Sequence, residues 1–313
     1  MAVPEPAPGA PGRLAGIPSP ALVLGAMASV QTGSAIARTL FHQVGPGGAV
    51  LVRLLFAAVI LLILGRRHLP GASTSAREVR LIVAFGLVLG AMNLTFYEAI
   101  DRIPLGIGVA IEFVGPLAVA IAGSRRRIDG LWVALAAAGI VAMTHGRAHG
   151  LDAFGVVLAL CAGACWAGYI LLNSRVGRAF SGSSALAPAM CIASLVAVPV
   201  GLAEAGSHLL EPRPLLLGLA VAVLSSVVPY SLEIEALRRI ATSVFGVLMS
   251  MQPAVAALAG FLVLGQSLSA RALVGIALVV FASVGASLHR ARRGSPASSA
   301  EEPPVPTWAS QGT

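Results

Sequence analysis

Apolar runs of about 20 residues alternate along the chain with short loops rich in Arg, Gly and Pro. A helix needs about 20 mostly apolar residues to cross the hydrocarbon core of a bilayer. The pattern therefore predicts an all-α integral membrane protein with ten transmembrane helices. The expected helices are 20–38, 47–65, 81–100, 104–124, 128–145, 153–173, 184–203, 214–236, 242–264 and 270–288.

The two ends of the chain differ from the apolar runs. Residues 1–16 are rich in Pro, Gly and Ala, and residues 289–313 are polar with several Pro and Ser, so both are expected to be disordered tails. The first apolar run has no strong basic segment before it and nine similar runs after it. We therefore expect a retained helix there, not a cleaved signal peptide.

Composition agrees with a membrane environment. Hydrophobic residues make up 57% of the chain and charged residues 11%, whereas a soluble protein carries about 25% charged residues. The net charge of +8 would suit nucleic-acid binding, but the arginines stand in short loops between apolar runs, so nucleic acid is not an expected partner. The three cysteines lie in predicted helices without a metal or redox spacing, and no metal or cofactor is expected.

The arginines fix the expected orientation. Fifteen of the 21 basic residues, all Arg, fall in the two tails and in the loops after the even-numbered helices, and five fall in the other loops. Positive loops remain on the cytoplasmic side of a membrane. We therefore expect a multi-pass protein of the inner cell membrane with both termini in the cytoplasm.

An internal repeat divides the chain. A shift of 137 residues places 98–123 on 235–260 with eight identities, among them Glu98 with Glu235, Arg102 with Arg239 and Pro116 with Pro253. Two five-helix repeats, 17–147 and 148–288, follow from this shift. Because five is odd, the repeats must enter the membrane with opposite orientation. Inverted repeats are typical of secondary transporters, which bind substrate near the midplane between the two halves.

Two prolines are expected to break helices. Pro116 and Pro253 are equivalent in the repeat and lie near the middle of their predicted helices. Proline has no N–H, so the carbonyl four residues earlier, at Glu112 or Met249, loses its helical donor. Such freed backbone is tolerated in a membrane where it faces protein or a water-filled cavity. A simple packing kink is the alternative.

Ionisable groups inside predicted helices are candidates for function because each costs at least about 2.5–3.5 kcal/mol to insert. Glu112 is the best candidate, as a proton-carrying carboxyl or as the partner of a substrate ammonium. Arg53 could hold a substrate carboxylate or form an ion pair with Glu98 or Glu112. The spacing of two places Glu233 and Glu235 on different helix faces. The candidate pathway residues are Glu112, Arg53, Asn93, Glu233, Gln252 and Tyr230.

Several other polar residues have structural interpretations. Glu235 is expected to pair with Arg238 or Arg239, and the i,i+4 spacing of Glu98 and Arg102 predicts a similar pair. The remaining polar or aromatic residues at mid-helix positions are Gln31, Ser34, Trp166 and Tyr169, and for the two aromatic residues packing is the expected role.

Four segments resemble the EamA family of the drug/metabolite transporter superfamily. They are VAIEFVGPLAVAIAGSRR (109–126), GACWAGYIL (163–171), PYSLEIEALRR (229–239) and FGVLMSMQPAVAAL (245–258). Within the family they look most like the bacterial threonine/homoserine exporters of the RhtA type. The resemblance runs from about residue 20 to 288. It implies ten helices in two inverted halves and export of small amino acids by proton antiport.

The resemblance also carries over to single residues. Glu112 matches the acidic position of the fourth-helix motif, and Glu233 matches the glutamate after Pro-Tyr-Ser-Leu. Gln252 departs from the pattern, because relatives usually have Glu-Pro where this chain has Gln252-Pro253, so a charged role at that position does not carry over to this chain. Glu235 is an additional acid.

Three function classes follow from these observations. The leading hypothesis is a secondary exporter of threonine, homoserine or similar amino acids, with protons and membrane lipid as its other partners and a homodimer left open. The alternative is a broader metabolite or drug exporter of the same superfamily, because fold does not determine substrate. A membrane-embedded enzyme is disfavoured, because the sequence shows no His-Glu-x-x-His motif, no Gly-x-Ser-x-Gly elbow and no nucleotide-binding loop.

Overall fold

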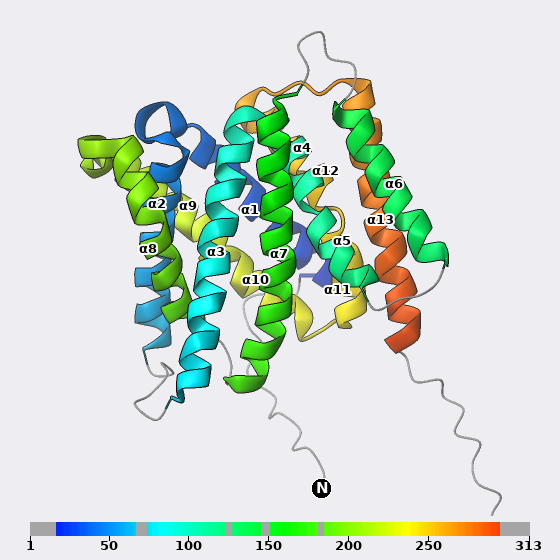
Figure 1. The fold of residues 1–313 in the computed structure, drawn as a ribbon, viewed down its shortest axis with the longest axis horizontal. Coiled ribbons are helices and arrows are strands. Elements are labelled where there is room, and N and C mark those ends of the chain that lie inside the picture. Colours follow the sequence, from blue (N-terminus) through cyan, green and yellow to red (C-terminus); the bar gives the residue numbers. More distant parts are fainter. Residues whose placement is uncertain (1–16, 67–73, 123–126, 145–150, 181–184, 295–313) are drawn as a thin grey trace, which may run out of the picture.

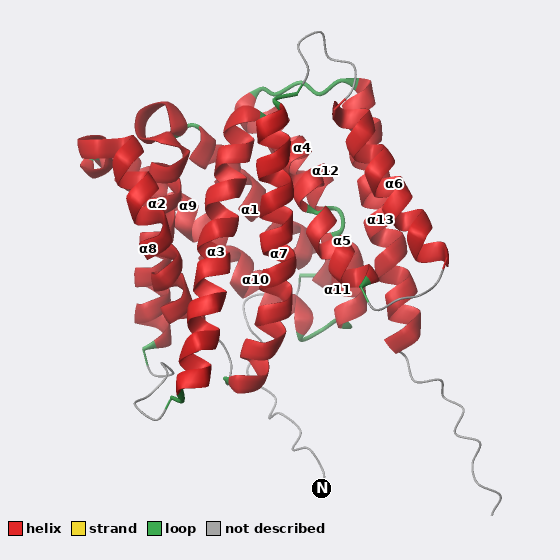
Figure 2. Ribbon diagram, viewed as in Figure 1, coloured by secondary structure: helices red, strands yellow, loops and turns green. Residues whose placement is uncertain are grey.

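The computed structural model describes residues 17–66, 74–122, 127–144, 151–180 and 185–294, and in this part of the chain helices are joined by short loops, without strands (Figure 2). The helices are α1 (Ser19–Arg38), α2 (Phe41–Gly65), α3 (Ala76–Arg102), α4 (Leu105–Glu112), α5 (Val114–Ile121), α6 (Arg127–Thr144), α7 (Ala153–Ala179), α8 (Leu186–Ala205), η1 (Gly206–Leu210), α9 (Pro212–Ala222), η2 (Val223–Val227), α10 (Val228–Leu237), α11 (Thr242–Met249), α12 (Gln252–Leu264) and α13 (Ala270–Gly294).

The predicted all-helical membrane architecture is confirmed. Among the described residues, eight helical stretches are long and apolar enough to cross a membrane. The fourth and fifth predicted helices are shorter apolar stretches, Leu105–Ile121 and Gly130–Thr144. Helix α13 runs to Gly294, beyond the predicted start of the C-terminal tail. The rest of both predicted tails lies outside the described residues.

Most helices run along one common direction and form a bundle (Figure 1). Three close pairs, α2 with α8, α3 with α7, and α6 with α13, join the first half of the chain to the second. Helix α1 packs against α10 in the middle of the bundle, and α4 packs against α12. The cavity described below lies among these central helices.

Two membrane stretches are broken at equivalent places. Helix α4 ends at Glu112 and α11 ends at Met249, each four residues before a proline, and α5 and α12 continue in the same stretch. The proline ring excludes the carbonyl four residues earlier from normal helical bonding, which explains both ends. Helices α4 and α11 have eight residues each, and their bounds differ by the 137-residue shift of the sequence repeat.

A third irregularity interrupts the stretch from Pro212 to Leu237. Residues Val223–Val227 form a π-helical segment just before Pro229. Pro229 has no N–H for the Ser225 carbonyl, so the helix widens there instead of continuing its regular ladder. The Ser29 hydroxyl of α1 donates to the Leu224 carbonyl at 2.6 Å, which fixes the widened segment against α1.

Helix α2 begins earlier than predicted and contains a break. It starts at Phe41, and Gly45 adopts φ 70°, which a residue with a Cβ rarely does. Glu204 of α8 accepts a hydrogen bond from the Gly47 N–H at 2.7 Å and thereby satisfies backbone freed by the break. The charge of Arg102 acts on the Glu98 carboxyl electrostatically, but no ion pair joins the two residues in the described part of the chain.

Arg102 instead pairs with Asp152 at the start of α7, at 3.3 Å. A sequence spacing on one helix does not reveal a partner that another helix brings closer. Asp152 also caps α7, because its carboxylate accepts the N–H groups of Phe154 at 2.8 Å and Gly155 at 3.4 Å. Desolvation raises the pKa of the Asp152 carboxyl, but these backbone bonds and Arg102 together hold it below its ordinary value of 3.8.

Replacing Asp152 with Ala is expected to lower the melting temperature of the purified protein by a few degrees, because α7 loses its cap and Arg102 loses its partner. The variant Asp152→Asn is the control, since its amide oxygen keeps the cap. A carboxyl group whose pKa is lower in the folded than in the unfolded protein stabilises the fold when the pH is above the unfolded-state pKa. This stabilisation is lost as the pH falls through the folded-state pKa. The difference from wild type should therefore shrink below pH 3.8. Equal melting temperatures at neutral pH would contradict this.

Two glycines allow α5 and α7 to touch. A Cβ on Gly115 would overlap the carbonyl oxygen of Gly163, and a Cβ on Gly163 would lie 2.7 Å from the carbonyl oxygen of Glu112. Small residues allow such close approach of membrane helices. This contact holds the break after α4 against α7.

Candidate functional site

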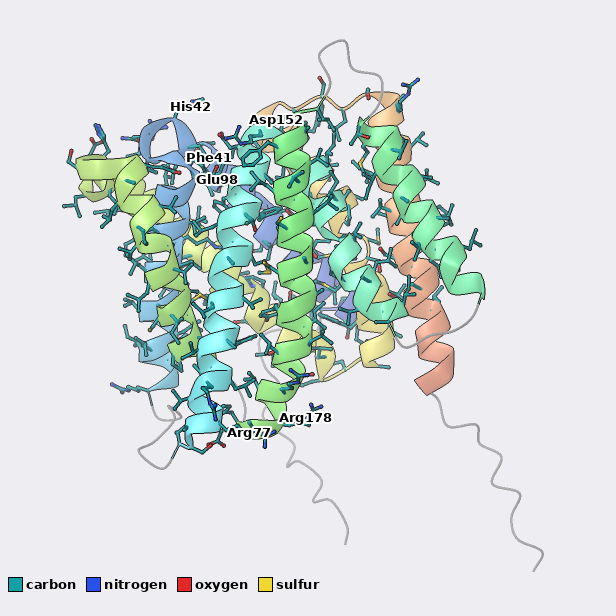
Figure 3. The ribbon with its side chains drawn as sticks, viewed as in Figure 1. Phe41, His42, Arg77, Glu98, Asp152 and Arg178 are labelled. Carbon is teal, nitrogen blue, oxygen red and sulfur yellow. The ribbon has the colours of Figure 1, made fainter. Side chains whose placement is uncertain are left out.

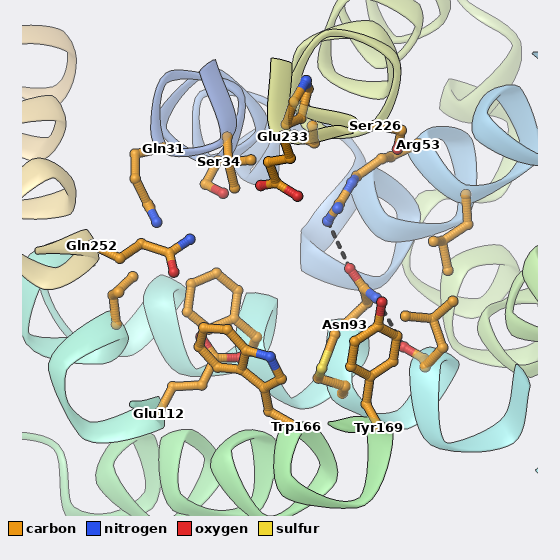
Figure 4. Close-up of a pocket in the computed structure, with 18 of the residues that line it drawn as sticks. Gln31, Ser34, Arg53, Asn93, Glu112, Trp166, Tyr169, Ser226, Glu233 and Gln252 are labelled. Atoms are coloured by element: carbon orange, nitrogen blue, oxygen red, sulfur yellow. Dashed lines mark hydrogen bonds between the residues drawn. The ribbon is translucent and has the colours of Figure 1, made fainter. Parts of the chain in front are cut away.

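A cavity of about 300 Å³ lies among the central helices (Figure 4). This volume is at the small end of the range for small-molecule sites. Residues from both halves of the chain line it. Its polar and aromatic lining includes Gln31, Ser34, Arg53, Asn93, Glu112, Trp166, Tyr169, Ser225, Ser226, Glu233 and Gln252.

Arg53 is the basic group of this cavity. Its Nη1 donates to Asn93 Oδ1 at 2.6 Å and to the Tyr97 hydroxyl at 3.2 Å, and its guanidinium lies 5.5 Å from the centre of the Tyr97 ring. These partners are neutral, so they orient the guanidinium without cancelling its charge. Arg53 Nε is buried and has no hydrogen-bond partner in the described part of the chain.

Glu112 is the last residue of α4 and stands at the break in that helix. It is 7% exposed, and within the described ranges no ion pair joins it to Arg53. The charge of Arg53 acts on it electrostatically. The Trp166 ring packs edge-on against Phe113 with 5.3 Å between ring centres, and Figure 4 shows Trp166 beside Glu112. The carboxyl group is therefore held in a largely apolar corner of the cavity.

Glu233 reaches the cavity from α10. Figure 4 shows its carboxylate between Ser34 and Arg53, across the cavity from Glu112. Glu235 is not among the lining residues and instead forms ion pairs with Arg239 and, at 3.6 Å, with Arg238. The two glutamates therefore have different surroundings, as their spacing of two predicted.

Two amides line another wall. Gln31 and Gln252 are 3% and 7% exposed, and the side-chain oxygen of each is buried without a hydrogen-bond partner among the described residues. Their side chains approach one another in Figure 4. A buried amide oxygen without a partner costs free energy, so a bound ligand that donates a hydrogen bond would remove this cost.

The structure thus brings five of the six predicted pathway residues, namely Arg53, Asn93, Glu112, Glu233 and Gln252, to one cavity. The side chain of the sixth, Tyr230, lies outside the described residues. The sequence interpretation missed Ser225 and Ser226, whose only signal is the following Pro229. It also assigned Trp166 and Tyr169 to packing, although both line the cavity.

The 137-residue shift relates many lining residues to one another. Each charged lining residue has an apolar equivalent that also lines the cavity. The equivalent pairs are Arg53 with Met190, Glu233 with Phe96, and Glu112 with Met249. The cavity is therefore lined by pairs of residues 137 positions apart in the chain but is asymmetric in charge. Within the described residues no group of three or more His, Cys, Asp or Glu could hold a metal ion.

The sequence of this chain is similar to those of several bacterial transporters. The chain is 44% identical over 271 residues to the threonine/homoserine exporter RhtA of Escherichia coli strain K12 and to that of Salmonella typhimurium strain LT2, covering 85% of this chain and 90% of each relative. It is 27% identical over 194 residues to the uncharacterized transporter YwfM of Bacillus subtilis strain 168, covering 59% of this chain and 65% of that protein.

A solved crystal structure with 17% sequence identity shares the fold, with a TM-score of 0.58 over 88% of this chain and 99% of that one. Residues 153–288 match the sequence model of the EamA-like transporter family. Together with the 44% identity to relatives along most of their length, this match shows that the chain belongs to the EamA-like transporter family.

Proposed function

We propose that this protein is a secondary active transporter that exports small amino acids such as threonine and homoserine across the inner membrane. One observation carries the proposal: Arg53, Glu112 and Glu233 line the same small cavity. A free amino acid carries a carboxylate and an ammonium group, and this cavity offers a partner to each. Relatives named as threonine/homoserine exporters support this substrate class.

The residues take separate roles in this proposal. Arg53, oriented by Asn93, binds the substrate carboxylate through its guanidinium group. Glu233 binds the ammonium group, because it lies on the same side of the cavity as Arg53 (Figure 4). Gln31 and Gln252 accept hydrogen bonds from the substrate. Glu112, at the helix break and without an ion-pair partner among the described residues, carries the exchanged proton.

The same proposal covers topology. Ten spans form two inverted five-helix repeats, 17–147 and 148–288, with both termini in the cytoplasm. The equal lengths and matching ends of α4 and α11 support the repeat, and the distribution of arginines supports the orientation. Inverted repeats that rock about a central site expose it to each side in turn. An inward proton gradient would then drive the substrate outward.

Efflux from proteoliposomes tests the function. Vesicles with the purified protein are loaded with labelled threonine or homoserine, and efflux is measured with and without a proton gradient. We expect efflux above protein-free vesicles that increases with the gradient. A parallel panel of lipophilic cations and other metabolites distinguishes the broader exporter. If the folded protein releases none of the amino acids but does release members of the panel, the substrate assignment is wrong.

The variant Arg53→Gln is expected to raise the substrate KM at least tenfold. A hydrogen bond to a charged group is worth about 1.5–3 kcal/mol, and 1.4 kcal/mol corresponds to a factor of ten. The control is Arg66→Gln, which removes an exposed arginine at the end of α2. An unchanged KM in Arg53→Gln would exclude Arg53 as the carboxylate partner.

A further inference from the structure

A second cavity, of about 830 Å³, lies far from the first, where α3 begins and α7 ends. Figure 3 shows Arg77 and Arg178 together at this end of the two helices, and Glu98 and Asp152 at the opposite end. Four arginines line this second cavity: Arg77, Arg80, Arg175 and Arg178.

The positive charge of the cavity is poorly compensated. Glu78 is the one acid among the described residues that line it, and the Glu78 carboxylate already accepts hydrogen bonds from the Ser75 N–H and hydroxyl, both at 2.8 Å. The first of these bonds and the bond from the Glu78 N–H to the Ser75 hydroxyl, at 3.3 Å, form the capping box of α3. Within the described residues no ion pair involves any of the four arginines. Four guanidinium groups therefore share the cavity with a single carboxylate, and that carboxylate is already hydrogen-bonded to Ser75.

The positions of these four arginines are more specific than the general enrichment of basic residues in cytoplasmic loops of membrane proteins. Arg77 and Arg80 are spaced i,i+3 on α3, and Arg175 and Arg178 have the same spacing on α7, so each helix presents both of its arginines on one face. The N-terminus of α3 adds the positive end of the helix dipole. Like charges gathered in this way repel one another unless an anion lies between them.

Apolar surface continues from the cavity along α3. Leu81 and Ala84 line its wall, and Val79, Val83 and Leu87 are 47%, 38% and 49% exposed at a spacing of four residues. This spacing forms one apolar stripe along the helix. A soluble anion would use the arginines alone, whereas a phospholipid would also cover the stripe with an acyl chain.

We propose that this cavity binds the phosphate headgroup of an anionic phospholipid, with an acyl chain along Val83 and Leu87. Basic pockets between membrane helices bind acidic headgroups in this way, and juxtamembrane arginines contribute about 1 kcal/mol each. The site uses none of the residues of the central cavity, so it does not depend on the transported substrate.

Binding of a fluorescent phosphatidylglycerol to the purified full-length protein tests the proposal. Phosphatidylcholine and inorganic phosphate are the competing probes. We expect phosphatidylglycerol to bind and the double variant Arg80→Gln/Arg178→Gln to weaken it about 25-fold, since about 1 kcal/mol per arginine is roughly a factor of five. The matched control Arg66→Gln/Arg213→Gln also removes two exposed arginines and should stay within about twofold of wild type.

The variant Arg80→Lys/Arg178→Lys keeps both charges and should retain most of the affinity. It separates loss of charge from loss of fold if the Gln variant does not fold. The proposal would be overturned by any of three results. Phosphatidylcholine could bind as tightly as phosphatidylglycerol, the control variant could weaken binding as much as the double Gln variant, or millimolar phosphate could displace the lipid completely. The last result would identify a site for free anions.

Discussion

Replacing Glu112 with Gln is expected to reduce proton-driven efflux to the level of protein-free vesicles. Gln has nearly the shape of a protonated glutamate but cannot release a proton, so the variant stays in one protonation state. Glu112 is 7% exposed at the end of α4, and no ion pair holds it within the described part of the chain. Exchange of labelled for unlabelled substrate needs binding but no net proton movement, so we expect this exchange to continue.

The control for this prediction is Glu235→Gln. Glu235 has the same chemistry, but it pairs with Arg238 and Arg239 outside the cavity, so its loss should leave efflux within about twofold of wild type. Proton-driven efflux by Glu112→Gln at the wild-type rate would remove Glu112 from the coupling step. Loss of both efflux and exchange in a folded variant would move Glu112 to substrate binding.

Replacing Gly115 with Ala is expected to have the largest effect on stability. The new Cβ would overlap the Gly163 carbonyl oxygen, and backbone cannot rotate away as a flexible side chain can. Helices α5 and α7 must then separate, and overpacking of this kind costs about 1–3 kcal/mol. We expect a lower melting temperature and a smaller yield of monodisperse protein in detergent.

The matched control is Gly177→Ala. Gly177 is also helical, in α7, but a Cβ there would have no heavy atom within 4 Å. Alanine favours a helix over glycine by up to about 1 kcal/mol, so this variant should be as stable as wild type or more stable. If both variants had equal melting temperatures, the contact between α5 and α7 would not limit stability.

Features that depend on one segment could be predicted from the sequence. Hydropathy indicated the membrane helices, and proline chemistry identified the carbonyls at Glu112 and Met249, where α4 and α11 end. The cost of placing a charge inside a membrane helix singled out Arg53 and Glu112 as candidates for function. Each of these inferences uses a property of a residue and its near neighbours along the chain.

Features that depend on contacts between two distant segments could not be predicted from the sequence. The partner of Arg102 is Asp152, 50 residues away, and no spacing on α3 reveals it. The Gly115–Gly163 contact and the cavity faces of Trp166 and Tyr169 likewise require the packing of α7 against its neighbours. The break in α2 at Gly45 depends on Glu204 of α8 to satisfy the freed backbone.

The apolar cavity residues that lie 137 positions from the charged ones suggest how the selectivity of such a site could change during evolution. If the two halves arose by duplication, one copy of each position kept or gained a charge, and the other copy was free to set the shape of the cavity. Met190, Phe96 and Met249 occupy these free positions. Changes in their size alter the space around a substrate while the charges that hold it stay in place. New selectivity could therefore evolve there without loss of coupling.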